Sequence, residues 1–473
     1  MAWPSLEPTS PHLTYMILAS FLIVYALFSE LIRNRIHISE PPLATLVGIA
    51  FGPRGVGALT PIQWGWEDNI TQELSRVIVG VQVFAVGVEL PKKYVKDHKK
   101  SLAILLLPNM ALGWVISAAI IYFVLGTSIS TALIIAACLT PTDPVLSASV
   151  LGESKFSSRV PKRLRNLLSA ESGCNDGTSF PFLYAGLLAV TKATKMEGIS
   201  SWLLDVILWQ CTVGIIVGIV IGYLGNRALR FSESRGYIQE ATLFAFYFLL
   251  AILCVGVGST LGADDFLVAF SAGATFCWDG WFSKKTRKMK LPSILDLLLN
   301  SSMFVYFGAV IPWHKFTGDG ALNPGKLVAC LILILLFRRI PSILALKSFM
   351  PDIKGWSEAL FAGHFGPMGV GALFLSIEAR ARLETRTSDP LPRPPKHSPN
   401  QDAIDTVWPV ICFVVLGSIM VHGCSAAVMS VVSSLARQTK ERDPLLGGEQ
   451  ERLYGMQDDN PEEDEEEAES DNT

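Results

Sequence analysis

A short polar stretch lies inside a long apolar segment of this chain. It covers residues 169–182, reads Ser-Ala-Glu-Ser-Gly-Cys-Asn-Asp-Gly-Thr-Ser-Phe-Pro-Phe, and carries Glu171, Asn175 and Asp176. A charge at the centre of a bilayer costs about 2.5–3.5 kcal/mol on insertion scales, so such residues face a protein interior or a wet cavity and mark an ion or proton pathway. Residues four apart share a helix face, which aligns Ser172 with Asp176. The stretch therefore predicts a patch of oxygen atoms inside a membrane helix.

Hydrophobic residues make up half of the 473-residue chain, and only 17% of the residues are charged. The apolar residues form runs of about 20, the length that crosses about 30 Å of hydrocarbon. Because lipid cannot satisfy an open backbone, each run must cross as a helix. This pattern predicts an all-α polytopic membrane protein with about 13 transmembrane helices, of which the sixth and thirteenth are long enough to be tilted or broken. The predicted spans are residues 13–33, 41–59, 70–90, 101–125, 128–151, 165–190, 201–224, 239–260, 263–282, 292–312, 325–347, 355–377 and 403–434.

Lysine and arginine gather in alternate loops between the predicted spans, beginning with Arg33 and Arg35. The positive-inside rule puts these loops in the cytoplasm, which leaves residues 1–12 outside and the C-terminus inside. The loop 379–401 is the exception, because it falls on the outer side and is strongly basic. It is long and rich in proline, which suits a disordered loop that is translocated despite its charge; a miscounted late span is the alternative. Its basic residues are Arg380, Arg382, Arg386, Arg393 and Lys396.

Two of the spans contain residues that interrupt a helix. The fifth holds Thr-Pro-Thr-Asp-Pro at 140–144, and the twelfth holds Gly-His-Phe-Gly-Pro-Met-Gly at 363–369. Proline removes a backbone donor and frees a carbonyl four residues earlier. An offset of seven spans reverses the direction through the membrane, so residues 13–190 and 239–434 are predicted to be inverted repeats joined by a linker span at 201–224. Matched breaks of this kind point to a transporter's binding site; two unrelated proline kinks are the alternative.

The fifth and sixth spans together offer an all-oxygen environment. Backbone carbonyls freed at the first break lie near Asp143, and the next span supplies Ser172, Asn175 and Asp176. Hard cations prefer oxygen ligands, so a small cation such as Na⁺ or Li⁺ would suit this environment. Without a cation, burial disfavours the charged form of a carboxylate, which then takes up a proton. One group that holds either a cation or a proton yields exchange once access to it alternates between the two sides.

These residues resemble the monovalent cation/proton antiporters, specifically the fungal plasma-membrane Na⁺/H⁺ antiporters. The resemblance covers about residues 10–435. It rests on Phe-Ala-Val-Gly-Val-Glu-Leu at 84–90, the Thr-Pro-Thr-Asp-Pro break, Glu-Ser-Gly-Cys-Asn-Asp-Gly at 171–177 and the Gly-Pro pair at 366–367. It implies a homodimer in the plasma membrane, with a dimer domain and a six-helix core domain that moves against it.

The resemblance also implies roles for individual residues. Asp176 would be the ion- and proton-binding carboxylate, and Asp143, the Thr142 backbone region and Ser172 would complete the site. The transported Na⁺ would therefore contact Asp176, Asp143 and Ser172. Asn175 would support the crossing of the two broken helices, and an Asn in place of a second Asp at this position resembles the electroneutral branch.

Glu171 needs a partner if it is buried, and Arg338 and Arg339 lie in the middle of the eleventh span, where charges are otherwise costly. The family suggests a core ion pair between the matching glutamate and arginine. We favour Arg339 over Arg338 as that partner. An architectural role for the pair is favoured over a direct role in transport.

Four further residues have two readings each. Glu89 ends the third span and is either a solvated helix end or, by the resemblance, a carboxylate of the cytoplasmic funnel. Asp264 and Asp265 begin the ninth span, where they either favour the helix N-terminus electrostatically or, by the resemblance, form an outer cation funnel. His364 lies within the second break and is either a packed histidine or a pH sensor.

The polar tail, residues 435–473, is acidic, which predicts disorder in the cytoplasm. It is a candidate for binding a cytosolic regulator or a sorting adaptor. Membrane lipids and a second copy of the chain are the other expected partners, and no nucleic acid is. The eight cysteines show no metal-ligand or redox spacing, and no cofactor is predicted besides the transported ions.

The sequence thus predicts a secondary transporter, not an enzyme, that exchanges cytosolic Na⁺, together with Li⁺, for extracellular H⁺ at Asp176. We expect the exchange to be electroneutral. A K⁺(Na⁺)/H⁺ antiporter of broader selectivity is the alternative within this class. A cation channel would need a filter-like loop that the sequence does not repeat, and an intramembrane aspartyl protease would pair Asp176 with Asp143 or Asp265 but lacks the Gly-x-Gly-Asp context. Ion preference, stoichiometry, activating pH and glycosylation of Asn69 stay open.

Overall fold

The computed structural model describes residues 9–65, 68–144, 146–147, 160–191, 194–286, 291–317, 322–392, 395 and 397–436. All regular elements in these ranges are helices. The predicted all-α membrane fold is confirmed there, while the count of 13 spans goes beyond what the helix lengths establish. By length and composition, 6 of the described helices are long and apolar enough to cross a membrane. These are Ser10–Leu31, Lys99–Leu125, Lys195–Ser234, Thr242–Leu261, Pro324–Phe349 and Gln401–Ser425.

The helices of the first half follow the predicted spans. They are α1 (Ser10–Leu31), α2 (Glu40–Phe51), α3 (Asp68–Glu89), α4 (Tyr94–Asp97), α5 (Lys99–Ile104), α6 (Met110–Leu125), α7 (Ile129–Cys138), α9 (Lys162–Thr178) and α10 (Phe180–Thr191). A π-helical stretch, Leu105–Asn109, joins α5 to α6 in one continuous span. α9 and α10 are separated at Ser179, so the long sixth span is broken.

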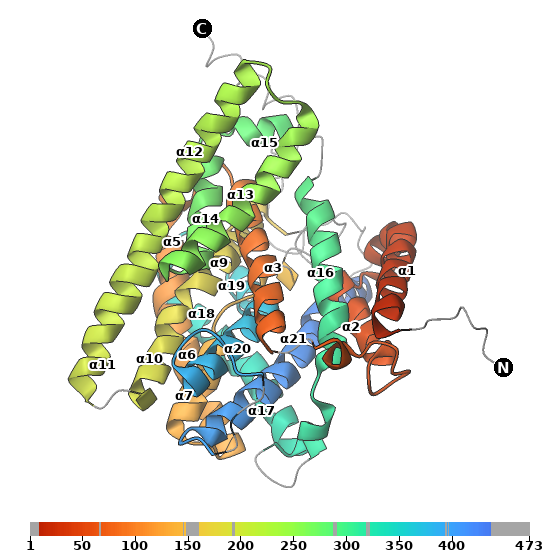
Figure 1. Ribbon diagram of the computed structural model, residues 1–473, viewed down its shortest axis with the longest axis vertical. Coiled ribbons are helices and arrows are strands. Elements are labelled where there is room, and N and C mark those ends of the chain that lie inside the picture. The colour runs from red at the N-terminus through yellow and green to blue at the C-terminus, as the bar shows by residue number, and fades with distance from the viewer. Residues whose placement is uncertain are drawn as a thin grey trace, which may run out of the picture.

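The second half contains longer rods and more interruptions. Its helices are α11 (Lys195–Ser201), α12 (Gly214–Ser234), α13 (Glu240–Leu261), α14 (Asp265–Phe276), α15 (Trp281–Thr286), α16 (Leu291–Val310), α17 (Pro324–Phe337), α18 (Ile340–Leu346), α19 (Trp356–His364), α20 (Val370–Thr385) and α21 (Gln401–Ala436). A π-helical stretch, Trp202–Val213, makes α11 and α12 a single rod. Figure 1 shows this rod at one edge of the molecule and α1 at the opposite edge.

Both predicted interruptions are present, and they face each other. The first lies between the end of α7 at Cys138 and the helical turn that restarts at Pro144; the second separates α19 from α20 at residues 365–369. The backbone N–H of Asp143 donates to the carbonyl of Pro367 at 2.8 Å, so the two unwound segments touch. A third break, which we did not predict, separates α17 from α18 at Arg338 and Arg339.

Helix α9, which carries the polar stretch, is held by close packing against α3 and α14. α3 and α14 approach each other at Gly87 and Gly273, where a Cβ atom on either glycine would overlap the backbone of the other helix. α9 packs at the same junction through Gly173, where an added Cβ atom would meet the side chains of Val86 and Phe270. Small residues permit such backbone contact in membrane helices. This packing brings the backbones of α3 and α14 close together and places α9 against both helices.

The loop predicted at 379–401 begins later than expected, because α20 continues to Thr385. Arg380 is a buried helical residue that pairs with Asp68 of α3 at 2.7 Å, and Arg382 pairs with Glu378 at 2.9 Å. The start of the loop was therefore predicted wrongly. These two arginines are neutralised within the fold, whereas Arg393 and Lys396 lie outside the described residues, as does most of the acidic tail.

Candidate functional site

Asp176 lies near the C-terminal end of α9 and is 1% exposed. Neither oxygen of its carboxyl group has a hydrogen-bond partner among the described residues. It packs against the backbone of α20, where a Cβ atom on Gly371 would overlap Oδ1. A buried ionised carboxylate without donors is costly in free energy. The ionised form of the Asp176 carboxyl group is therefore unfavourable in the structure as described.

Asp143, in contrast, is held by backbone groups on both sides of the crossing. Its Oδ1 accepts from Leu146 N at 2.9 Å, and its Oδ2 accepts from Val370 N, the first residue of α20, at 2.5 Å. The Asp143 carboxyl group thus meets the positive end of α20, which favours an anion. The carboxyl groups of Asp143 and Asp176 both lie against the start of α20, at Gly369 and at Gly371. Gly369 is needed here, because a Cβ atom would overlap the Asp143 carboxyl group.

Hydroxyl and carboxamide groups link the first break to α9. Asn175 accepts from Thr142 N at 3.1 Å and donates to Thr142 Oγ1 at 2.7 Å. Ser172 Oγ lies 3.0 Å from Thr142 Oγ1 and 3.2 Å from Ser147 Oγ. Asn175 therefore clamps the unwound backbone, and Ser172 presents a hydroxyl oxygen on the helix face that also carries Asp176.

Arg338 has a role that the sequence did not reveal. Its Nη1 donates to the carbonyl of Leu139, with longer contacts of 3.4 Å to the carbonyls of Thr140 and Pro141. Its Nη2 donates to the carbonyl of Gly366 in the second break. One buried guanidinium thus satisfies carbonyls at the C-terminal ends of α7 and α19, where a cation is favoured.

The ion pair of Glu171 is formed by Arg339. The guanidinium nitrogens Nη1 and Nη2 contact the two Glu171 oxygens at 2.6 Å each, and Nε donates to the carbonyl of Ala362 at 2.9 Å. Glu171 is 0% exposed and Arg339 is 6% exposed. The ion pair connects α9 to the segment between α17 and α18, and the Arg339 contact with Ala362 connects that segment to α19. Glu171 precedes Asp176 by little more than one helical turn of α9.

The remaining predicted site residues lie outside this cluster. Glu89 is exposed at the end of α3. Asp264 caps α14, with Oδ1 accepting from two backbone N–H groups at 3.0 Å each, whereas Asp265 pairs with Arg76 at 3.1 Å. His364 ends α19, where its Nε2 lies 3.0 Å from Ser425 Oγ. Within the described ranges no group of three or more His, Cys, Asp or Glu residues is arranged to hold a metal ion.

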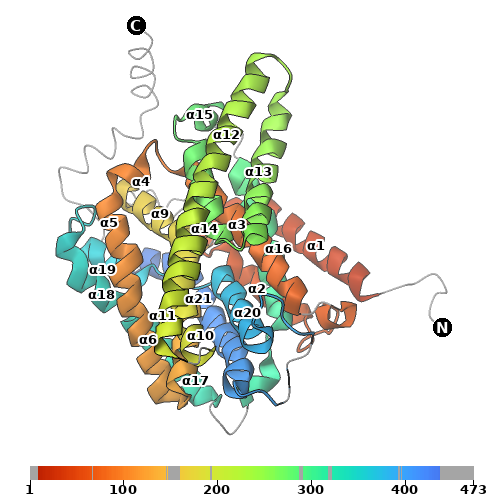
Figure 2. The same ribbon diagram turned by 60° about the vertical axis from the view of Figure 1, so that its left-hand side comes forward.

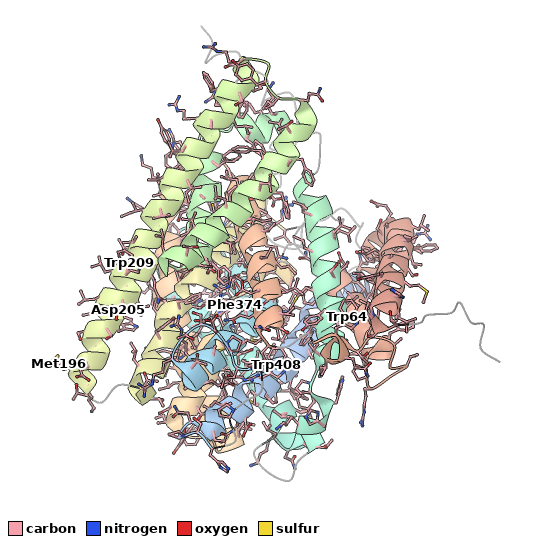
Figure 3. The ribbon with its side chains drawn as sticks, in the orientation of Figure 1. Trp64, Met196, Asp205, Trp209, Phe374 and Trp408 are labelled. Carbon is pink, nitrogen blue, oxygen red and sulfur yellow. The ribbon has the colours of Figure 1, made fainter. Side chains whose placement is uncertain are left out.

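A second polar cluster, which the sequence did not indicate, joins α3 to α20. Gln72 Nε2 donates to Glu378 Oε2 at 2.7 Å, and the guanidinium of Arg76 lies 5.1 Å from the centre of the Phe374 ring. Figure 3 places Phe374 near the middle of the bundle, whereas Asp205 and Trp209 lie at its edge. Together with the Asp68–Arg380 pair, these contacts close the space between α3 and α20 on the side toward residue 68.

The close approach of Gly371 to Asp176 gives a sharp prediction. Gly371→Ala should displace the carboxyl group and lower the activity of the site by roughly 10- to 100-fold, as expected when a reacting group moves by about 1 Å. Gly256→Ala on α13 is the matched control, because nothing lies within 4 Å of its added Cβ. Equal activities of the two purified variants would contradict this packing.

Comparison with known proteins identifies what the chain is similar to. A family model described as sodium/hydrogen exchanger, transmembrane, matches residues 18–432. A probable Na⁺/H⁺ antiporter of Schizosaccharomyces pombe is 44% identical over 452 residues, which cover 94% of this chain and 60% of that protein. A Na⁺/H⁺ antiporter of Saccharomyces cerevisiae is 43% identical over 91% of this chain and 44% of its own length. The chain thus spans about half the length of these two relatives.

A further relative has nearly the same length. This Schizosaccharomyces pombe Na⁺/H⁺ antiporter is 36% identical over 92% of this chain and 93% of its own length. The solved structure of a sodium proton antiporter from Methanocaldococcus jannaschii superposes with a TM-score of 0.64, covering 90% of this chain and 98% of the other at 16% sequence identity. At that identity the match concerns the fold alone.

Proposed function

The chain belongs to the sodium/hydrogen exchanger family, and we propose that it exchanges Na⁺, together with Li⁺, for H⁺ across the fungal plasma membrane. The observation that carries this proposal is the Asp176 carboxyl group, which is buried beside two broken helices and has no hydrogen-bond partner among the described residues. A carboxylate in that position is neutralised by a proton or by a monovalent cation. Competition between the two at one group couples their movements.

In this mechanism the neighbouring groups have separate tasks. Ser172 and the Thr142 segment supply neutral oxygen ligands that replace part of the hydration shell of Na⁺. Asp143 adds negative charge nearby while its oxygens hold the helix ends together. Arg338 and the Glu171–Arg339 pair hold the broken helices together, so that Asp176 keeps its position within the core domain while access to it changes.

We further propose that access alternates between two bodies of the chain. The repeats would be residues 13–190 and 239–434, with residues 201–224 as linker. The core domain would contain α5, α6, α7, α9, α10 and α17–α21. The dimer domain would contain α1–α3 and α13–α16 and would pair with a second copy. In the proposed topology the N-terminus lies outside, so the contacts between α3 and α20 would close the outer side of the protein. These contacts must break before ions from the exterior can reach Asp176.

Purified protein in proteoliposomes tests the function. An imposed Na⁺ gradient should drive proton movement, and with one-for-one exchange the rate should not change when the membrane potential is clamped at different values. An extra proton per cycle would instead add about 2.3 kcal/mol per 100 mV to the driving force. Replacing NaCl by KCl tests the alternative of broader selectivity. Failure of every cation gradient to move protons would reject antiport.

Locking the outer contacts should stop the cycle. In a chain whose 8 native cysteines have been replaced, Gln72→Cys with Glu378→Cys should form a crosslink between α3 and α20. We expect oxidation to abolish exchange and a reductant to restore it. The control is Gln82→Cys with Asn300→Cys, a hydrogen-bonded pair that lies within the proposed dimer domain. Full exchange by fully crosslinked 72–378 protein would show that these helices need not separate.

A further inference from the structure

A small apolar cavity has none of the Asp176 site residues in its lining. Its volume is about 170 Å³, and it is enclosed by the end of α3, the connection that follows α3, α12 and α14. Leu90, Phe270, Ala274, Ile215 and Ile219 form much of its wall. The cavity is smaller than the pockets that hold drug-sized ligands, which are about 300–1,000 Å³. Its size and lining suit a segment of an acyl chain.

The open edge of this cavity is basic and aromatic. Lys93 and Trp278 both line it, and both are exposed. Lys93 has a φ of 59°, a left-handed conformation that a lysine adopts at a cost in free energy. No Asp or Glu lines the cavity, and neither Lys92 nor Lys93 forms an ion pair within the described part of the chain. Positive charge therefore lies at the mouth of an apolar hollow.

Several of the residues around the cavity are exposed apolar or aromatic side chains. Ile215 is 39% exposed, Ile219 is 44% exposed and Trp278 is 43% exposed. Figure 2 shows the rod of α11 and α12 along the face of the molecule that is turned away from α1. Tryptophan is enriched at membrane–water interfaces, and basic loops lie on the cytoplasmic side, where the leaflet carries anionic lipids.

We propose that this cavity binds one anionic phospholipid from the cytoplasmic leaflet. A stretch of acyl chain fills the hollow between α3, α12 and α14, and the ammonium group of Lys93, with Lys92 beside it, holds the phosphate group. Trp278 lies at the level of the headgroup. The bound lipid contacts both α12 and the connection from α3 to α5. That connection joins the proposed dimer domain to the proposed core domain.

Quenching of tryptophan by lipids brominated on the acyl chain tests this site. The full-length protein is reconstituted in phosphatidylcholine with brominated phosphatidylserine or brominated phosphatidylcholine, and the signal of Trp278 is obtained by difference from Trp278→Phe. We expect the anionic lipid to bind about fivefold more tightly, the gain expected from one basic residue near the surface. Equal quenching by the two lipids would mean ordinary boundary lipid and would overturn the proposal.

Three variants and one matched control test the charge at Lys93 and the shape of the hollow. Lys93→Asn, which tolerates the left-handed conformation, should remove the preference for phosphatidylserine, while Lys93→Arg should keep it. Lys99→Asn is the matched control, since Lys99 is an exposed lysine of the same basic run that does not line the cavity. Ala274→Leu should fill the hollow and reduce quenching by both lipids.

Two outcomes would contradict the assignment directly. One is an unchanged preference for phosphatidylserine in Lys93→Asn protein that elutes as the wild type does. The other is unchanged quenching by both lipids in folded Ala274→Leu protein, which would show that no acyl chain enters the hollow.

Discussion

Asp176→Asn is expected to reduce Na⁺-driven proton exchange in proteoliposomes to the rate of empty liposomes. The carboxamide has nearly the same shape as the carboxyl group, but it cannot release a proton or neutralise a cation. Burial without donors makes the native charge costly, so the neutral Asn should leave the fold intact or stabilise it. The expected result is thus a well-folded protein that transports neither ion.

The matched control is Asp205→Asn, which changes the same chemical group at an exposed position on the rod that includes α12. It should exchange at the wild-type rate. Elution volume and thermal unfolding of both variants show whether the fold is retained. Substantial exchange by folded Asp176→Asn protein would mean that another group carries the ions.

Glu171→Gln is expected to cause the largest loss of stability among the single changes considered. The substitution leaves the Arg339 guanidinium buried without its bidentate partner, and breaking a buried pair in this way costs about 3–5 kcal/mol. Thermal or denaturant unfolding of the purified protein, followed by light scattering and tryptophan fluorescence, measures the effect. Exchange should fall because the junction of α9, α18 and α19 loosens.

An exposed ion pair provides the comparison. Glu233 and Lys285 lie 2.6 Å apart with side chains 32% and 50% exposed, and such pairs contribute about 0–1 kcal/mol. Glu233→Gln should therefore change stability little. Adding Arg339→Gln to Glu171→Gln should recover part of the loss, because it removes the unpaired charge. Similar stability of Glu171→Gln and Glu233→Gln would contradict a structural role for the buried pair.

Sequence reasoning reached the features that depend on local chemistry. The two interrupted spans follow from proline and glycine within apolar runs, because proline breaks the helix hydrogen-bond ladder wherever it lies. A partner for Glu171 among the arginines of the eleventh span follows from the cost of an unpaired charge in lipid. The limits of α20 were missed, because Arg380 and Arg382 look like loop residues until Asp68 and Glu378 are placed beside them.

Features that depend on contacts between distant segments could not be predicted from the sequence. The carbonyls that Arg338 satisfies lie 199 to 197 residues earlier in the chain and 28 residues later. Likewise, nothing local distinguishes Asp264, which caps a helix, from Asp265, which meets Arg76 of α3. The hydrogen bond between Gln72 and Glu378 spans 306 residues. Polar residues in membrane spans indicate such contacts but do not identify the partners.

The central claim is that a metal ion and a proton exclude each other at Asp176. The most direct test adds NaCl to weakly buffered, detergent-purified protein and measures proton release, with choline chloride as the ionic-strength control. Where Asp176 is mostly protonated, the apparent affinity for Na⁺ should fall about tenfold for each unit of lower pH, and binding should release close to one proton per chain in the wild type and none in Asp176→Asn. Na⁺ binding that releases no protons, or equal release by the variant, would contradict the account.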